Sequence, residues 1–349
     1  MKKINVLSLF NGMNTGRQAL ENVGIKVNKY YSSEIKPYAI ELTQHHFPDT
    51  IQVGDVTKWK EWDIDWKSID LVLSGSPCQD LSAAGKRAGI NGKKSSLFFV
   101  FVDILNHIKL LNPNVLFLQE NVGSASKLDV GIMSRALGVY PVRINSKLVT
   151  AQLRDRYYWS NIRTKQDGMF GDLVTDIPQP KDRGIMFKDI LTSGETKREK
   201  SNCLTEGLIE KVGRHKIKDF NNWQKMLLKR PSSMVILIYE KNEVRVKTNT
   251  KKGYDVVTNN DCIDLSFPTS TTRRGRVTKG KSPCLMESNN NLYCLSDGYV
   301  RLVNKIEMCR LQGFPDNYCD ILNDRKAGSL LGDGWTLPII EHIFSFINK

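Results

Sequence analysis

The chain has 349 residues, enough for a large α/β domain with a smaller domain appended to it. Its formal net charge of +14, from 51 basic and 37 acidic side chains, favours a polyanionic partner, nucleic acid above all. The seven cysteines form no C-x-x-C pair, and no apolar run reaches the roughly 18 residues of a membrane span. We therefore expect a soluble, cytoplasmic protein with reduced thiols, no metal site, no membrane contact and no obligate protein partner.

The first segment is typical of a nucleotide-binding unit. Residues 4–10 predict a short apolar strand, which leads into a turn with Gly12 and Gly16, and a helical pattern begins at Arg17. Glycine lets the backbone approach a ligand closely, and a helix N-terminus favours a carboxylate or phosphate. The glycines do not follow G-x-G-x-x-G, so an adenosine ligand other than a dinucleotide is favoured.

Two further predicted strands end at an acidic residue. Residues 29–33 lead to Glu34, about 20 residues past the glycine turn, where an acid commonly accepts hydrogen bonds from ribose hydroxyls. Residues 51–53 lead to Asp55. Either acid alone could be an ordinary exposed loop residue. Three successive strand ends that carry Phe10, Glu34 and Asp55 together favour a ligand site.

The next predicted strand ends at a cysteine. Residues 69–74 form an apolar run with the length of a buried strand, and Cys78 follows a Gly-Ser-Pro turn. A thiol at the carboxyl end of a strand in an α/β sheet is well placed to act as a nucleophile. A small buried hydrophobe is the alternative interpretation. Residues 79–94, rich in glycine and basic residues, predict either a mobile loop that closes over a phosphate backbone or a solvated connector.

A carboxylate and two arginines follow. A helix over residues 97–110 precedes a buried strand over residues 113–118, which delivers Glu120 and Asn121 to the same edge of the sheet. Arg154 and Arg156 alternate, which on a strand would place both guanidinium groups on one face. Alternating arginines also occur on solvated strands, so this spacing alone leaves their role open.

The centre of the chain is irregular over about residues 182–291, where residues 234–239 predict the clearest strand. Residues 269–281 contain several basic residues and no acid. They predict a flexible loop that contacts phosphates and could read guanine through one arginine. A solvated basic loop is the alternative.

Six ordered motifs resemble those of the DNA cytosine-5 methyltransferases. They are Phe10-x-Gly12, Pro77-Cys78-Gln79, Glu120-Asn121-Val122, Gln152-x-Arg154-x-Arg156, Arg310-Leu311-Gln312-Gly313-Phe314-Pro315 and Leu331-Gly332-Asp333-Gly334-Trp335-Thr336-Leu337-Pro338. Details such as Thr15-Gly16 and Gly332-x-x-Trp335 resemble the catalytic domain of animal de novo methyltransferases more than most bacterial restriction-associated methyltransferases. The composition, rich in lysine and asparagine, favours a stand-alone microbial or phage enzyme.

The resemblance implies an α/β fold with a doubly wound, mostly parallel, Rossmann-like sheet and a smaller inserted target-recognition domain. The expected domains are residues 1–180 for catalysis and cofactor binding, residues 181–295 for target recognition, and residues 296–349 for the return to the catalytic domain.

The resemblance also implies methyl transfer from S-adenosyl-L-methionine to C5 of a cytosine flipped out of double-stranded DNA. The implied catalytic residues are Cys78 as the nucleophile at C6, Glu120 as the acid near N3, Asn121, Arg154 and Arg156. The implied cofactor-binding residues are Phe10, Asn11, Gly12, Met13, Thr15, Glu34, Ile35, Asp55, Val56, Ser76, Pro77, Asp333, Gly334 and Trp335. The implied DNA-binding residues are Gln79, Ser82, Lys86, Arg87, Thr271, Thr272, Arg273, Arg274 and Arg276, with Arg273 at the position of an arginine that reads guanine.

Three other functions stay open. The chain could methylate cytosine in transfer RNA, against which its long basic central insert argues. It could be a non-catalytic DNA-binding accessory protein, against which the joint presence of Cys78, Glu120, Arg154 and Arg156 argues. It could be a thiol enzyme of an unrelated class, which would lack the adenosine-site residues.

Overall fold

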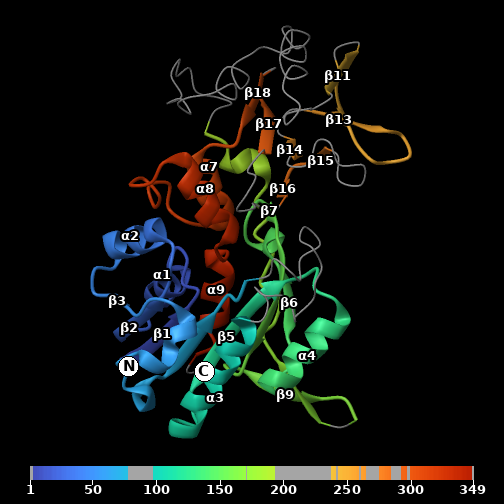
Figure 1. The fold of residues 1–349 in the computed structure, drawn as a ribbon. Coiled ribbons are helices and arrows are strands. Elements are labelled where there is room, and N and C mark those ends of the chain that lie inside the picture. Colours follow the sequence, from blue (N-terminus) through green and yellow to red (C-terminus); the bar gives the residue numbers. More distant parts are fainter. Residues whose placement is uncertain are drawn as a thin grey trace. The chain divides into compact units, whose positions relative to one another are not determined.

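The chain divides into two compact units in a computed structural model that describes residues 3–77, 97–169, 171–192, 237–240, 243–258, 261–264, 275–283, 292–296 and 299–347 (Figure 1). Unit 1 comprises Met1–Ser146, Asp155–Lys181 and Gly334–Lys349, and unit 2 comprises Lys147–Arg154 and Asp182–Asp333. Unit 2 resumes at Asp182, and the chain returns to unit 1 at Gly334. The last two helices before Gly334 belong to unit 2, where they contact one another.

Unit 1 is built on a seven-stranded sheet with the strand order β3-β2-β1-β4-β5-β8-β6. The strands from β3 to β5 run parallel, whereas β8 pairs antiparallel with both β5 and β6. This mostly parallel sheet, flanked by helices, confirms the predicted fold class. The strand bounds are β1 Ile4–Leu9, β2 Val27–Ser33, β3 Ile51–Gln52, β4 Leu71–Ser74, β5 Leu116–Val122, β6 Val142–Asn145 and β8 Asp155–Ser160.

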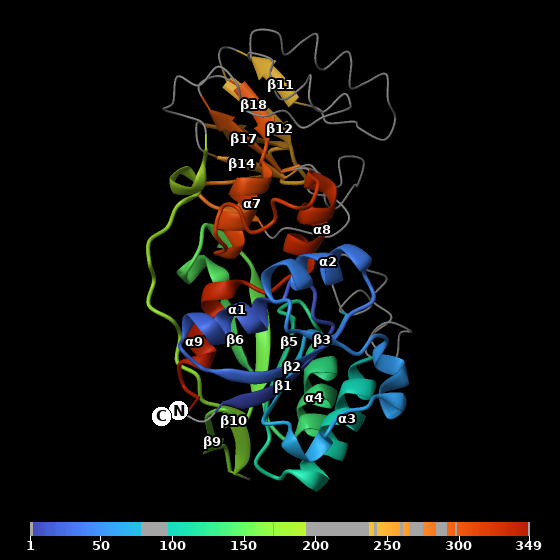
Figure 2. The same cartoon turned by 90° about the vertical axis from the view of Figure 1, so that its left-hand side faces the viewer.

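Helices cover both faces of this sheet, with α1 and α9 on one face and α3 and α4 on the other (Figure 2). None of the helices in the described ranges is long and apolar enough to cross a membrane. The helix bounds are α1 Thr15–Asn22, α2 Pro37–His46, α3 Leu97–Leu111, α4 Lys127–Leu137 and α9 Leu337–Phe344, with the short 3-10 helices η1 Val56–Glu61 and η2 Trp66–Ser68 and the hairpin β9 Thr164–Asp167 and β10 Asp172–Thr175.

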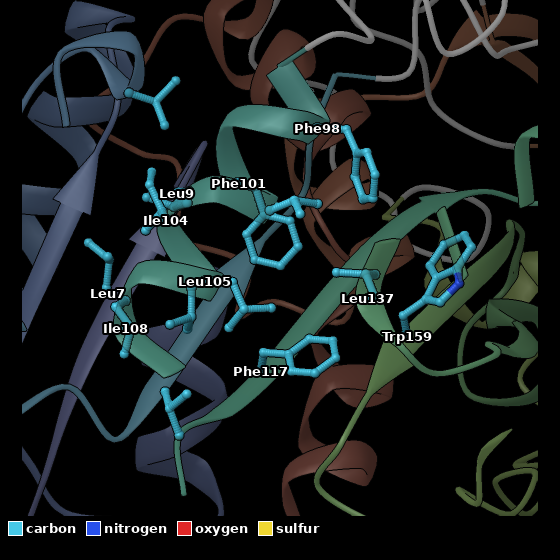
Figure 3. Packing of buried hydrophobic residues seen from close by; sticks show 14 of the residues in the cluster. Leu7, Leu9, Phe98, Phe101, Ile104, Leu105, Ile108, Phe117, Leu137 and Trp159 are labelled. Carbon is cyan, nitrogen blue, oxygen red and sulfur yellow. The ribbon is translucent and has the colours of Figure 1, made fainter. Parts of the chain in front are cut away.

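The main core of unit 1 lies between the sheet and the helix α3 (Figure 3). The apolar residues of α3 recur three or four positions apart, which places them along one face of the helix. That face packs on side chains of β1, β5 and β8. The core side chains labelled in Figure 3 are Leu7, Leu9, Phe98, Phe101, Ile104, Leu105, Ile108, Phe117, Leu137 and Trp159, all of them buried.

The strand order reverses direction between β1 and β4. The chain runs outward from β1 through β2 to β3 and then returns to place β4 on the other side of β1, so that Leu9 pairs with Ser74. In open α/β sheets, ligands bind outside the carboxyl ends of the strands at such a switch point. The turns that follow β1 and β4 therefore lie where this fold class holds its ligand.

The described residues of unit 2 form two small antiparallel sheets and the helices α7 and α8. Its first sheet has the order β11-β12-β13 and its second the order β15-β14-β17-β18, while β7 pairs in parallel with β16. Elements of unit 2 are β7 Gln152–Leu153, η4 Phe187–Ile190, β11 Leu237–Glu240, β12 Glu243–Lys247, β13 Tyr254–Val257, β14 Cys262–Asp264, β15 Arg276–Thr278, β16 Ser282–Pro283, β17 Leu292–Ser296, β18 Tyr299–Leu302, α7 Lys305–Gln312 and α8 Asp324–Asp333. The 3-10 helix η3 Ser146–Leu148 spans the point where the chain passes from unit 1 to unit 2.

One predicted loop proves to contain a strand. Residues 269–281 were expected to be irregular throughout, but Arg276–Thr278 form β15, which pairs antiparallel with β14. The pairing supplies backbone partners that no local pattern of the segment predicts. Arg276 is exposed at the edge of its sheet.

Candidate active site and cofactor-binding site

The turn after β1 has an unusual backbone. Phe10, Gly12 and Asn14 all have positive φ values, of 56°, 57° and 63°. Of the three, only glycine adopts this conformation without a steric penalty, so the non-glycine residues indicate a turn held by its surroundings.

Buried polar contacts beneath the turn supply that support. The Asn11 amide donates to Thr43 Oγ1 at 3.3 Å and accepts a hydrogen bond of 3.3 Å from the Tyr30 hydroxyl. Burial raises the pKa of Tyr30, which keeps its hydroxyl protonated as a donor. The buried guanidinium of Arg17 lies over the Tyr30 ring and pairs with Asp49 at 3.0 Å. The turn thus rests on a fixed polar layer.

Asn14 is a feature of this turn that the sequence analysis missed. Its side chain is fully buried, and neither atom of its amide group has a hydrogen-bond partner among the described residues. Buried polar groups in proteins almost always have partners. An unsatisfied buried amide in this turn fits the polar adenosine cofactor that the motifs imply. The only local signal was the tolerance of asparagine for the left-handed region.

Glu34, at the end of β2, is tied to this turn. Its Oε2 accepts the N–H of Gly12 at 2.8 Å, and its Oε1 accepts the N–H groups of Ile35 and Lys36 at 2.8 and 2.9 Å. These bonds hold the carboxylate at the carboxyl edge of the sheet, where the sequence analysis placed it. Ile35 beside it is 71% exposed, a large fraction for an apolar side chain that is expected to contact a ligand.

Asp55 follows β3 and begins the helix η1. One of its carboxylate oxygens accepts hydrogen bonds from both the N–H and the hydroxyl of Thr57, each at 2.9 Å. These bonds lower the pKa of Asp55 because they favour its charged form. Val56 is buried in the main core, whereas the Asp55 side chain lies at the surface.

The turn after β4 is joined to β5 through Ser76. The Ser76 hydroxyl accepts hydrogen bonds from the side-chain amides of Gln119 at 2.9 Å and Asn121 at 3.4 Å. All three side chains are buried. Ser76, two residues before Cys78, is thereby fixed to the strand that carries Glu120 and Asn121. Pro77 is the last described residue before the gap in which Cys78 lies.

Glu120 occupies the centre of the described site. It lies within β5, and Arg156 on the antiparallel neighbour β8 forms an ion pair with it, with 2.8 Å between Arg156 Nε and Glu120 Oε1. The other carboxylate oxygen accepts the indole N–H of Trp335 at 3.1 Å. Glu120 is only 7% exposed, so its charge is held by these specific partners and less by bulk water.

Arg154 does not share a strand with Arg156. The strand β7 ends at Leu153 and β8 begins at Asp155, and the two strands belong to different sheets. The buried Arg154 guanidinium donates to the backbone oxygens of Gly332 at 3.0 Å and Asp333 at 3.4 Å, within unit 2. The predicted common strand face for the two arginines is therefore wrong, because the chain changes sheet between them.

Several predicted site residues have no described position. Cys78, Gln79, Ser82, Lys86, Arg87, Thr271, Thr272, Arg273 and Arg274 lie outside the described residues. Of the remaining predicted cofactor residues, Met13 and Thr15 have buried side chains in the turn after β1, and Gly334 directly precedes Trp335. Asp333 is exposed and ends α8 in unit 2.

The strand order defines a Rossmann-like α/β protein, and the polar groups at the carboxyl ends of β1, β2, β4 and β5 form a candidate site at its topological switch point. The model of the C-5 cytosine-specific DNA methylase family matches residues 4–349 of this chain. The chain therefore belongs to this family. The family predicted from the six motifs is confirmed.

Curated relatives carry methyltransferase names. The orphan methyltransferase M.Rho11sI of Bacillus phage rho11s is 31% identical over 217 residues, which is 58% of this chain and 40% of that protein. The type II methyltransferase M.NlaIV of Neisseria lactamica is 36% identical over 126 residues, which is 35% of this chain and 28% of that protein. The matches thus span less than half the length of these relatives. The type II methyltransferase M.HpaII of Haemophilus parainfluenzae is 25% identical over 354 residues, 97% of this chain and 88% of that protein.

Solved structures share the fold. The Entamoeba histolytica methyltransferase EhMeth superposes with a TM-score of 0.58 at 15% identity, and the match covers 99% of this chain and 98% of EhMeth. The S. pombe Dnmt2 methyltransferase superposes with a TM-score of 0.55 at 15% identity over the same shares of the two chains. At these identities the similarity concerns the fold alone.

Proposed function

We propose that this chain transfers a methyl group from S-adenosyl-L-methionine to C5 of cytosine in double-stranded DNA. The observation that carries the proposal is the Glu120 carboxylate, held by Arg156 at the sheet edge to which Ser76 also fastens the segment before Cys78. Membership of the cytosine-specific family supplies the substrate class. The net charge of +14 is compatible with a duplex DNA partner.

Cytosine C5 is a weak nucleophile, and the proposed chemistry first adds a nucleophile to C6. The Cys78 thiolate forms the S–C6 bond, and the electron pair of the C5–C6 double bond shifts into the ring, where Glu120, protonated when the base is bound, provides a proton at N3. The bound cofactor supplies the electrophilic methyl group that C5 then takes up. Loss of the C5 proton to a base, cleavage of the S–C6 bond and return of the N3 proton to Glu120 release the thiolate and restore the neutral aromatic ring.

The remaining catalytic residues hold the base and its charge. We assign Asn121 to holding the cytosine, and Arg154 and Arg156 to the cytosine O2 and the thiolate. For Arg156, the ion pair with Glu120 supports the assignment because it places a cation beside the acid. Since a base-paired cytosine is out of reach, the target base would be flipped out of the duplex. Residues 79–94 would close behind it, and Arg273 would read an adjacent guanine.

The cofactor would be bound at the carboxyl ends of β1 to β4. Phe10 would pack on the adenine, Asp55 with Val56 would contact the adenine edge, and Glu34 would accept hydrogen bonds from the ribose. The turn from Gly12 to Thr15 would hold the methionine end, for which the unsatisfied Asn14 amide is suited. The segment from Asp333 to Trp335 would cover the cofactor. The protein would act in the cytoplasm, where microbial or phage DNA lies.

The test is bisulfite sequencing of DNA from a methylation-free bacterial host that expresses this chain, beside the same host expressing Cys78→Ala. Methylated cytosines in a fixed sequence context, absent with Cys78→Ala, are the expected result. Unmethylated DNA from a host with ample folded wild-type protein would contradict the proposal. Transfer RNA from the same cells, sequenced in parallel, would then show whether the substrate is RNA.

A further inference from the structure

Glu120 has a second partner that the proposed chemistry leaves unused. The indole N–H of Trp335 donates to Glu120 Oε2 at 3.1 Å, while Arg156 Nε lies 2.8 Å from Oε1. Each carboxylate oxygen therefore has its own donor, and the two donors come from different elements. Two such contacts fix the rotation of the carboxyl group, which a single ion pair leaves free.

The indole is itself held in place. A Cβ built on Gly75 would lie 2.8 Å from Trp335 Nε1 and 3.3 Å from Cε2, so the edge of the ring rests directly on the Gly75 backbone. The next residue along the chain is also fixed, because the Thr336 hydroxyl bonds the Ser146 hydroxyl at 2.8 Å and both residues are buried. The turn after β4 thus contacts the indole ring, and the Thr336 contact anchors the backbone that carries it.

We infer that Trp335 is a positioning residue that orients the Glu120 carboxyl group through its indole N–H. The inference rests on the proposed function for the identity of the reaction. An indole N–H only donates, so Trp335 takes no part in proton transfer and acts through Glu120. The same side chain belongs to the segment assigned to the cofactor. Trp335 therefore links the segment that would cover the methyl donor to Glu120, the acid proposed to protonate the cytosine.

The principal test is the single-turnover kinetics of Trp335→Phe. This variant keeps an aromatic ring and removes the N–H donor. We expect the rate of methyl transfer to fall by about tenfold, the order expected for loss of a hydrogen bond to a charged group. The KM for S-adenosyl-L-methionine should stay unchanged. Gly75→Ala leaves the indole chemistry intact but displaces the ring, so it should lower the rate in the same way.

A matched control removes an indole N–H that holds nothing. The Trp62 indole nitrogen is buried and has no hydrogen-bond partner among the described residues. Trp62→Phe should keep the wild-type rate. In a Glu120→Ala background, Trp335→Phe should cost no further rate, because the group that it orients is already gone. The inference would be overturned if Trp335→Phe raised the KM for S-adenosyl-L-methionine and left the rate unchanged. It would also be overturned if the rate losses of Trp335→Phe and Glu120→Ala multiplied in the double variant.

A second measurement does not depend on activity. In ¹H–¹⁵N spectra, the Trp335 indole resonance is assigned by its loss in Trp335→Phe. Glu120→Ala should shift this resonance and leave that of Trp62 in place. If the chemical shift of the Trp335 indole resonance is unchanged in Glu120→Ala, the inference is overturned even if the enzyme is active. If the wild-type protein methylates nothing, the proposed function fails, and the spectra alone decide whether Trp335 orients Glu120.

Discussion

Glu34 combines a structural contact with its assigned role in ligand binding. Its carboxylate accepts backbone N–H groups from both sides, from Gly12 in the turn after β1 and from Ile35 and Lys36 after β2. The Glu34 carboxylate therefore both holds the conformation of the turn and is assigned to accept hydrogen bonds from the ribose of the ligand. The effect of replacing it should therefore exceed that of removing one ligand contact.

Glu34→Gln should weaken cofactor binding by at least tenfold, or about 1.4 kcal/mol. An amide accepts through one atom only, so its NH₂ group faces a backbone N–H and one of the three bonds is lost. Isothermal titration with S-adenosyl-L-methionine measures the change. Glu41→Gln, on an exposed position of α2, is the control and should bind as the wild type does. Equal affinities for all three proteins would remove Glu34 from the site.

The positions of individual site residues were predictable where an apolar run in the sequence marks the end of a strand. Glu34, Asp55 and Glu120 follow or end short apolar runs, and the structure places them at the carboxyl ends of β2, β3 and β5. The partner of Glu120 was not predictable in this way, because Trp335 lies 215 residues further along the chain. A contact of that separation leaves no periodic or local signal in a single sequence.

The start of η1 shows how a single element depends on charge. Asp55 caps this helix through Thr57, and those hydrogen bonds lower the pKa of Asp55. A depressed pKa contributes stability that is present above the unfolded value, near 3.9, and lost as the pH falls through the folded value. The contribution is reduced by the exposure of the carboxylate to solvent.

Asp55→Ala should lower the free energy of unfolding by about 0.5–1 kcal/mol near neutral pH. The difference from wild type should shrink as the pH falls below the folded pKa of Asp55, because the wild-type cap then loses its charge. Asp55→Asn keeps a neutral cap and should retain its stability across the same range. Urea unfolding of the three proteins at several pH values measures this. A deficit of Asp55→Ala that persists undiminished at acid pH would show that the charge of the cap is irrelevant.

Elements were predictable to the extent that their signal is local. The apolar runs of β1 and β4 and the apolar face of α3 lie at the predicted positions, within a few residues. Local sequence patterns did not predict strands whose extent depends on pairing with a distant strand. The strand β5 extends to Val122 because β8 pairs with it, and β15 exists because β14 supplies its partner. In both cases the deciding residues are distant in the sequence.

The whole molecule carries an excess of positive charge that should dominate its affinity for DNA. If it neutralises six or more phosphates, duplex binding should weaken by about 10³-fold or more between about 50 and 200 mM salt. Fluorescence anisotropy with a labelled duplex measures the slope. Arg276→Ala, at the exposed edge strand β15, should reduce the slope by about one.

Lys29→Ala is the control for this measurement. Lys29 is exposed near the amino end of β2, away from the carboxyl edge that carries the site residues of unit 1. Its removal changes the net charge by the same amount and should leave the slope unaltered. Equal slopes for all three proteins would exclude Arg276 from phosphate contact.

The path by which the chain crosses between its two units was only partly predictable. The crossing near residue 181 coincides with a change in composition, whereas the crossings at Ser146, Arg154 and Asp333 are marked by no linker or charge run. The segment Lys147–Arg154 joins unit 2 through the pairing of β7 with β16, whose residues lie far along the chain. Only a three-dimensional contact assigns so short a segment to a unit.

The close approach of Trp335 to Gly75 sets the order in which these two positions can change during evolution. While the indole is present, a methyl group at position 75 collides with it. Once the indole has been replaced by a smaller side chain, position 75 can accept alanine without a collision. The reverse order passes through an intermediate in which a displaced ring leaves Glu120 misaligned. In alignments of related chains we expect side chains at position 75 to occur only where the tryptophan has been lost.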